Sequence, residues 1–410
     1  MLLLELPDVL LLVGAAVLLV ELVVIVHRWP AIGIWLFGGV AMATSLGLGR
    51  VVVMETIQVS ALDYAILVLL GALGRGLLVG RRLSMAVVVL LALLGLALLR
   101  GIADFGLETA VNAGRELLYV LVGVAFVTVC APRQAWPAIQ RLWTVAGAVF
   151  LGIAVVFLVR HGLGTYAVTG ERALSASQAL IVAQAGVIAL GRPGRWYPQA
   201  FAFACFGVVL ASQQRTVWAA AAIAVLVLAL KASPLGAEHV SPRVRVAVSV
   251  AVVGVLVLMA IGPAGLRESV SKATSTVSTT SGTFGWRIDG WEGLVRSYGE
   301  RPITDQAVGQ PGGAGFDREV GGGLVTVSPH NMYLTVLLAL GAVGLVALLV
   351  LYAEALRATV RTNPRLHALV WSLVVFSIGY QIAAEDALIL GAALAAPALT
   401  PARTRAVAAP

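Results

Sequence analysis

Three basic residues in this sequence have side chains suited to an anionic substrate. Arg215 ends a polar run at residues 212–215 that opens an apolar segment, and no acidic residue lies near it in the sequence. Arg287 and His330 follow in a long polar stretch. The guanidinium group is a planar fork of donors that matches phosphate oxygens. Two arginines that face one cavity could therefore hold a pyrophosphate without a metal ion.

His330 lies where the polar stretch returns to an apolar one. Ser328 and Pro329 form a helix-start signature, with Ser at the N-cap and Pro at the first position, which puts His330 in the first helical turn. The positive end of the helix dipole disfavours imidazolium and keeps the ring neutral. A neutral histidine at the mouth of a cavity is what a general base requires. An interfacial histidine bonded to headgroups or loop backbone is the alternative.

Each arginine also has a simpler interpretation. A charge at the centre of a bilayer costs roughly 2.5 to 3.5 kcal/mol on insertion scales, so Arg215 indicates a buried partner or an anionic ligand. Alternatively, Arg215 extends to the headgroups. Arg287 could pair with Asp289 or be solvated.

Motifs of soluble metal and nucleotide enzymes are missing from the sequence. There is no phosphate loop ending in Lys-Ser or Lys-Thr, no His-Glu-x-x-His, no cysteine pair and no Asp-x-Asp. Asp104 and Glu108, at positions i and i+4, could form an acid–base pair or a metal site, but a solvated loop face explains them better. Cys130 and Cys205 lie in apolar runs and are expected to be buried thiols. We expect no cofactor and no metal, and the donor must already be activated.

Composition places these residues in a membrane protein. Of 410 residues, 60% are hydrophobic and 12% charged, against about 45 to 50% and 25% in soluble domains. That excess excludes a soluble enzyme and suits some twelve spans of ~20 residues. We therefore predict an all-α fold, a polytopic transmembrane bundle of about twelve spanning helices. A thirteenth, shorter run at residues 387–399 could cross or merely re-enter the membrane, and we favour the crossing.

The net charge of +8 encodes orientation, and we expect no nucleic-acid partner. Arginines concentrate in every second short loop, which the positive-inside rule assigns to the cytoplasm, so the amino terminus lies outside. The predicted spans lie near residues 8–26, 31–49, 61–80, 83–99, 116–130, 142–159, 174–190, 196–211, 216–230, 244–261, 331–352 and 367–384.

This topology divides the chain into a bundle of ten spans at residues 1–261, a long exterior loop at 262–330 and C-terminal spans at 331–410. Within the loop, residues 269–283 are rich in Ser and Thr and indicate a flexible linker. Then comes the stripe of an amphipathic helix, suited to the outer membrane interface. A Gly-rich stretch after Pro302 could approach a ligand closely or move as a lid. The stripe comprises Ile288, Trp291, Val295 and Tyr298.

The order of these features resembles the bacterial O-antigen ligase and polymerase family of polytopic, metal-independent glycosyltransferases. The resemblance covers roughly residues 208–350. It is carried by the polar run ending in Arg215, the sequence Trp-Arg-Ile-Asp-Gly-Trp at 286–291, Ser-Pro-His-Asn at 328–331, and the Gly-x-x-Gly at 341–344. One departure is the segment 307–309, Ala-Val-Gly, where family members often carry Gly-x-Gly.

The resemblance implies roles for these residues. Arg215 and Arg287 would bind the diphosphate of an undecaprenyl-linked glycan, and His330 would activate the acceptor hydroxyl. The expected substrate-binding residues beside them are Gln214, Trp291, Asn331 and Gly309.

The implied protein is a multi-pass enzyme of the bacterial inner membrane with its active site on the exterior face. Its partners would be an undecaprenyl-diphosphate-linked glycan donor, a glycan or glycolipid acceptor, and membrane lipids. A ligase moves the glycan to a different acceptor, whereas a polymerase extends the lipid-linked glycan, and the pattern fits both. A transporter of lipid-linked glycans is a third alternative, although it would more often show internal repeats and broken helices at the midplane.

Overall fold

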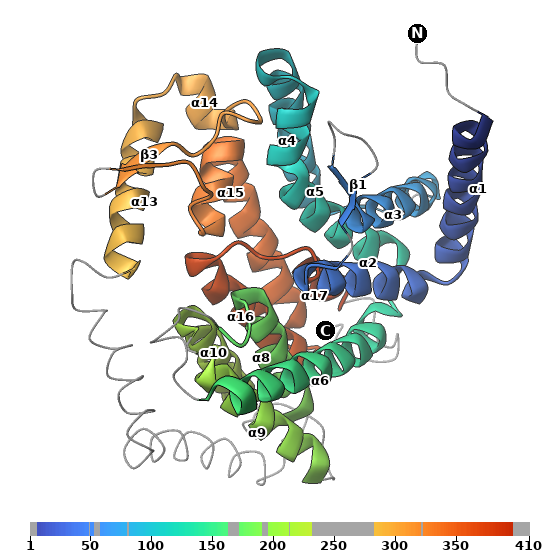
Figure 1. The fold of residues 1–410 in the computed structure, drawn as a ribbon, viewed down its shortest axis with the longest axis vertical. Coiled ribbons are helices and arrows are strands. Elements are labelled where there is room, and N and C mark those ends of the chain that lie inside the picture. The colour runs from blue at the N-terminus through green and yellow to red at the C-terminus, as the bar shows by residue number, and fades with distance from the viewer. Residues whose placement is uncertain are drawn as a thin grey trace, which may run out of the picture.

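The protein is a bundle of helices with two short hairpins, shown in Figure 1. The computed structural model describes residues 6–48, 50–52, 58–79, 82–162, 172–190, 196–212, 214–231, 283–320 and 323–396. The predicted span at 244–261, most of the Ser- and Thr-rich linker, Gln213, Gly321 and Gly322 lie outside the described residues.

Helices in the first part of the chain follow the apolar runs closely. They are α1 (Leu6–Arg28), α2 (Pro30–Ser45), α3 (Ala61–Leu78), α4 (Met85–Phe105), α5 (Leu107–Cys130), α6 (Ala135–His161), α8 (Ala176–Leu190), α9 (Trp196–Ala211) and α10 (Arg215–Lys231). A hairpin of β1 (Arg50–Val52) and β2 (Gln58–Ser60), which the sequence did not predict, precedes α3.

The second part contains α13 (Thr283–Gly299), α14 (Ile303–Val308), β3 (Arg318–Val320), β4 (Gly323–Val325), α15 (Met332–Thr359), α16 (Pro364–Gly379) and α17 (Asp386–Ala395). The antiparallel pair β3 and β4 was also not predicted, so the fold is mostly helical rather than purely so. In Figure 1, α1 and α13 lie at opposite edges of the molecule.

Five described helices, α3, α4, α5, α6 and α15, are long and apolar enough to cross a membrane. Six others, α2, α8, α9, α10, α16 and α17, are apolar but have only 10 to 17 residues. The structure therefore supports a polytopic membrane protein, while twelve full-length spans are not reached in its described part. The thirteenth predicted run forms the 10-residue α17.

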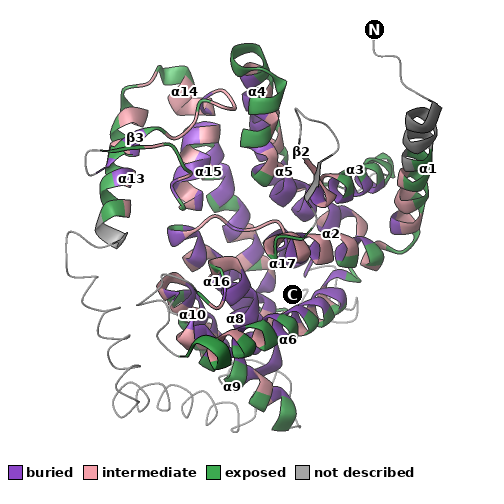
Figure 2. Cartoon of the chain, in the orientation of Figure 1, coloured by how far each residue is buried: buried purple, intermediate pink, exposed green. Residues whose placement is uncertain are grey.

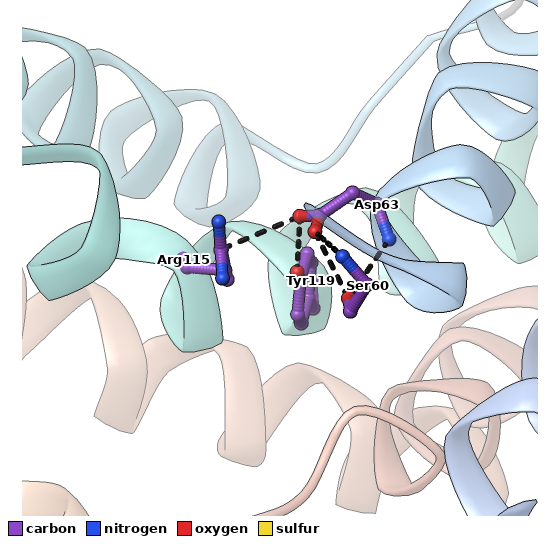
Figure 3. Close-up of polar contacts among 4 residues, drawn as sticks. All are labelled: Ser60, Asp63, Arg115 and Tyr119. Carbon is purple, nitrogen blue, oxygen red and sulfur yellow. Dashed lines mark hydrogen bonds and ion pairs between the residues drawn. The ribbon is translucent and has the colours of Figure 1, made fainter. Parts of the chain in front are cut away.

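A carboxylate fixes the start of α3 and its contact with α5. Ser60 caps α3 by accepting from the backbone N–H of Asp63, and the Asp63 carboxylate accepts from the backbone N–H of Ser60 at 2.7 Å, which is a capping box. Figure 3 shows the same carboxylate in contact with two side chains of α5. Tyr119 donates its hydroxyl to it, and Arg115 Nε lies 3.3 Å away. Asp63 thus orders both helices.

The core lies among α5, α8 and α17, which are buried along most of their length in Figure 2. A chain of hydrogen-bonded polar side chains crosses this core. Trp143 Nε1 donates to Gln184 Oε1 at 2.7 Å, and Gln184 Nε2 donates to Ser372 Oγ at 3.2 Å. Cys205 is buried as expected and Cys130 partly so. These contacts link α6, α8 and α16.

Asp104 and Glu108, for which the sequence favoured a solvated loop face over a paired site, do not share a helix. Gly106 has a φ of 86° and separates α4 from α5, so the two carboxylates belong to different helices. The i, i+4 spacing failed because it assumed an unbroken helix. Both side chains are exposed, and no group of three or more His, Cys, Asp or Glu gathers among the described residues.

Helix α13 divides its apolar stripe between two surfaces. Trp291 and Tyr298 pack with the buried Leu294 against Leu334 of α15 and its neighbours. The other two stripe residues remain 43% (Ile288) and 52% (Val295) exposed. Half of the stripe thus fixes α13 to the bundle, and the other half is available for an interface.

Helix α15 is broken at Gly341, whose φ is 70° and ψ is −174°. A Cβ at Gly341 would lie 2.3 Å from the Ala307 carbonyl oxygen, so the glycine allows the end of α14 to enter the break. Gly309, with φ of 90°, lies equally close to the backbone of α15. Arg100 of α4 holds this junction by donating to the Gly309 carbonyl and pairing with Asp305 at 2.7 Å.

The connection between α16 and α17 lies inside the protein. The Glu385 and Asp386 carboxylates at its end are both buried. One oxygen of Asp386 accepts from the Ala383 N–H at 3.1 Å. Residues 380–385 are therefore buried or half-buried.

Candidate functional site

Arg215 is the first residue of α10, and the side chain before it is tightly held. Gln214 is buried, accepts from Arg172 Nη1 at 2.8 Å and from the Tyr380 hydroxyl at 3.3 Å, and donates to the Leu174 carbonyl at 3.2 Å. Three segments distant in sequence meet at this amide. Gln214 therefore fixes the position at which α10 begins.

Arg287 lies in the first turns of α13 and points toward the end of α16. Its Nη1 donates to the Gly379 carbonyl at 3.3 Å, and its guanidinium carbon lies 5.1 Å from the centre of the Tyr380 ring. A cation in that position is attracted by the ring face. Asp289, the alternative partner, is exposed, and no ion pair joins it to Arg287 among the residues described. The Arg287 guanidinium thus contacts neutral groups, the Gly379 carbonyl and the Tyr380 ring.

His330 precedes α15 instead of lying in its first turn. The N-cap is Asn331, whose side chain accepts from the Leu334 N–H at 2.9 Å, so the predicted cap at Ser328 was wrong. Because the Asn331 side chain already caps the first turn of α15, the helix begins at Met332 and Ser328 does not act as its N-cap. His330 itself has a φ of 50°, in the left-handed region that few residues other than glycine adopt.

The electrostatic surroundings of His330 favour a neutral ring. Partial removal from water lowers the pKa of its imidazole below the ordinary 6.5, and the positive charges of Arg287 and Arg318 lower it further. Its position before the N-terminus of α15 acts in the same direction. The ring can therefore accept a proton at neutral pH, as a general base must.

One short segment, Gly379 to Gln381, contacts the surroundings of all three candidates. The Tyr380 ring lies 6.4 Å from the His330 ring, centre to centre, and Tyr380 also contacts Arg287 and Gln214. Gly379 lies against Thr216, the residue after Arg215, because a Cβ there would be 2.5 Å from the Thr216 hydroxyl. Arg287, His330 and the two residues that flank Arg215 therefore all contact one segment.

Gln381 completes this arrangement. Its Nε2 donates to Ser328 Oγ at 2.6 Å and to Thr335 Oγ1 at 2.8 Å, on either side of His330 in the sequence. Sequence reasoning missed Tyr380 and Gln381. A Gly-Tyr-Gln at the end of a long apolar run was the available signal, since it introduces polar groups where a helix stops.

The other predicted substrate-binding residues have structural contacts. Trp291 Nε1 donates to the Pro329 carbonyl at 2.7 Å, which ties α13 to the His330 loop. Asn331 caps α15, and Gly309 lies against α15 at the Gly341 break. Trp291 and Asn331 adjoin His330, whereas the contacts of Gly309 are with α4 and α15.

Arg318 on β3 is another residue near the site that the sequence did not single out. It is buried, and its Nη1 donates to the carbonyls of Phe316 at 2.9 Å and Val327 at 2.7 Å. Its guanidinium carbon lies 6.0 Å from the ring centre of Trp286. Nothing in the local sequence distinguishes it from the exposed charges beside it.

An apolar cavity of about 180 Å³ lies under the Gly-rich loop. The loop reaches it by backbone contacts, since the Gly312 N–H donates to the Ala97 carbonyl of α4 at 2.8 Å. Among the described residues its lining carries no charged group, so the candidate chemistry lies outside it. The cavity is lined by parts of α4, α5, α15 and the loop, including Leu94, Leu98, Leu117, Phe316 and Leu340.

One comparison with known proteins matches the second half of the chain. Residues 200–349 match the family model described as O-antigen ligase, which confirms the resemblance seen at residues 208–350. The match contains Arg215, Arg287 and His330, and it ends before the Gly379 to Gln381 segment. No curated protein matches the chain.

Proposed function

We propose that this chain, whose residues 200–349 belong to the O-antigen ligase family, moves a glycan from an undecaprenyl-diphosphate carrier to a sugar hydroxyl. The observation that carries the proposal is the convergence of two elements on Tyr380. One brings Arg287 and the other His330, and the start of α10 at Arg215 adjoins the same segment. Family membership supplies lipid-linked glycans as the substrate class.

The proposed reaction is a direct displacement at the anomeric carbon. The acceptor oxygen forms a bond to that carbon as the bond to the diphosphate oxygen breaks, and undecaprenyl diphosphate leaves. Attack on the face opposite the leaving group inverts the configuration. Negative charge develops on the departing phosphate, where Arg215 and Arg287 would stabilise it as preorganised donors. These guanidinium groups supply the charge that a metal ion supplies in other transferases.

His330 would accept the proton of the acceptor hydroxyl in the same step. Its lowered pKa keeps it neutral before the reaction. The imidazolium formed during transfer would lie near the departing diphosphate, whose negative charge favours it. The base and the anion site therefore assist each other in the transition state.

The choice of acceptor separates a ligase from a polymerase of the same family. We favour a ligase-like transfer in cell-surface polysaccharide synthesis and retain the polymerase as the alternative. A transporter of lipid-linked glycans is less well supported. Although α15 is broken at Gly341, the backbone of Ala307 and Gly309 packs into the break.

The proposal includes a location. The enzyme would lie in the bacterial inner membrane, with α13, α14 and the His330 loop on the exterior face, where lipid-linked glycans are assembled into surface polymers. The apolar helices support a membrane protein, and the predicted charge bias of the short loops supports this orientation.

Three variants test the proposal in purified protein supplied with a lipid-linked donor and an acceptor. Arg215→Ala, Arg287→Ala and His330→Gly are each expected to lower transfer by at least about 10²-fold, the usual effect of losing a charge-stabilising donor or general base. Glycine at 330 adopts a positive φ without strain, so this variant keeps the loop conformation. Arg296→Gln, on the exposed part of α13, is the matched control. Undiminished transfer by any of the three would refute its assigned role.

A further inference from the structure

We infer that Arg318 is a third substrate-binding arginine, which together with Arg287 forms an oxyanion subsite beside His330. This inference rests on the proposed transfer reaction and adds a contact to the same site. The oxyanion would be a phosphate group of the donor or an acidic group of the acceptor.

Among the described residues, the charge of Arg318 has no counterion. Only 7% of the residue is exposed, yet the two hydrogen bonds of its Nη1 go to neutral carbonyls, and no described residue bonds to its Nε. No carboxylate lies within ion-pair distance of it in the described part of the chain. A buried guanidinium in this state is costly and calls for an anion.

A purely structural role does not account for that charge. The carbonyls of Phe316 and Val327 flank the β3–β4 hairpin, and Arg318 joins them. A neutral amide could donate to the same oxygens without bringing a buried charge. The hydrogen bonds therefore explain the position of the side chain but leave its charge unexplained.

Arg318 packs against α13, the helix that carries Arg287, and lies close enough to His330 to affect its ring electrostatically. Its guanidinium lies near the Trp286 ring, next to Arg287 in the sequence. Gly290, about one turn further on, has no side chain to displace Arg318, since a Cβ there would be 2.9 Å from Nε. The charges of both arginines also act on the His330 imidazole.

The nearby carboxylates do not neutralise this region. Asp289, Asp317 and Glu319 are all exposed, and none is paired with Arg287 or Arg318 among the described residues. Within the described part of the chain, the two guanidinium groups and the His330 imidazole thus have no anionic partner. A planar guanidinium group can donate two parallel hydrogen bonds to two oxygens of one phosphate or carboxylate. An anion of this kind would supply the missing negative charge.

Inorganic pyrophosphate is a suitable probe, because its binding can be measured without glycan transfer. The full-length protein is treated with diethyl pyrocarbonate across a pH series, and modification of His330 is followed by peptide mass spectrometry. In the wild type, pyrophosphate should raise the apparent pKa of His330 and slow its modification. Arg318→Gln should weaken pyrophosphate binding about tenfold or more, as expected for a lost charged hydrogen bond. Arg318→Lys should fall between, and Arg296→Gln should match the wild type.

Steady-state kinetics then identify the source of the oxyanion. A raised KM for the donor in Arg318→Gln assigns the subsite to the diphosphate, and a raised KM for the acceptor assigns it to an acidic acceptor group. Equal pyrophosphate affinity in Arg318→Gln and wild type would overturn the inference. If that variant does not fold, the wild-type titration decides, since no effect of pyrophosphate on His330 would also overturn it. Pyrophosphate binding without glycan transfer would support the subsite and reject the proposed reaction.

Discussion

His330 is the residue whose protonation state should be visible in the kinetics. Only the neutral imidazole accepts a proton, and its fraction rises as pH increases through the pKa. Because burial and two arginines lower that pKa, the acid limb of kcat/KM should have its midpoint below pH 6.5. Removing a neighbouring charge with Arg318→Gln should move the limb toward higher pH. Transfer rates measured from pH 4.5 to 8 check this.

The direction of that shift is decisive. Arg296→Gln, which removes an equal but exposed charge from α13, should leave the limb unchanged. An acid limb above pH 6.5 in the wild type, or a downward shift in Arg318→Gln, would contradict the electrostatic account.

Tyr380 should act as a positioning residue through its ring. Its face attracts the Arg287 guanidinium, an interaction of about 0.5 to 2 kcal/mol. Tyr380→Leu should therefore raise the donor KM about tenfold, while Tyr380→Phe, which loses only the hydroxyl bond to Gln214, should remain within a few fold of wild type. Tyr64→Leu in α3 is the control. If Tyr380→Phe were as defective as Tyr380→Leu, the hydroxyl bond to Gln214, and not the ring face, would be the contact that positions the site.

At the level of residues, the sequence revealed the candidates whose type is unusual in an apolar chain. Arg215 and Arg287 were visible as charges, and His330 as a titratable group at the edge of a span. Tyr380, Gln381 and Arg318 were not visible, because their significance lies in contacts with residues that are distant in sequence.

At the level of elements, the break in α15 gives a stability prediction. Gly341→Ala places a Cβ 2.3 Å from the Ala307 oxygen at a φ of 70°, and such strain costs about 1 to 3 kcal/mol. The thermal unfolding temperature should fall, and α14 should separate from α15. Gly74→Ala in α3 meets no atom within 4 Å and should be neutral or stabilising. Equal unfolding temperatures for the two variants would show that a glycine at position 341 does not contribute to the stability of the fold.

Element positions were predictable where hydropathy alone decides them. Eleven of the twelve predicted spans coincide with described helices, and the other lies outside the described residues. Boundaries were less predictable, since Asn331 rather than Ser328 caps α15 and Gly106 ends α4. Both hairpins were missed, because strands of three residues are too short for an alternating pattern.

At the level of the whole molecule, the orientation is testable by chemical labelling. Helix α15, with its break at Gly341, runs from Met332 to Thr359 and is long and apolar enough to cross a membrane. With Cys130 and Cys205 replaced by Ala, an impermeant maleimide should label Glu292→Cys on α13 in spheroplasts. Thr362→Cys, beyond the other end of α15, should react only after the membrane is opened. The reverse pattern would place the site on the cytoplasmic face.

The central claim is that arginine charges and one histidine perform glycosyl transfer without a metal ion. The most direct measurement follows the purified wild type and His330→Gly in excess chelator, and quantifies undecaprenyl diphosphate and the new glycoside together. We predict that the wild type forms both in equal amounts with inverted anomeric configuration, and that His330→Gly forms neither. Transfer that stops in chelator and returns with added metal, or that persists in His330→Gly, would contradict the account.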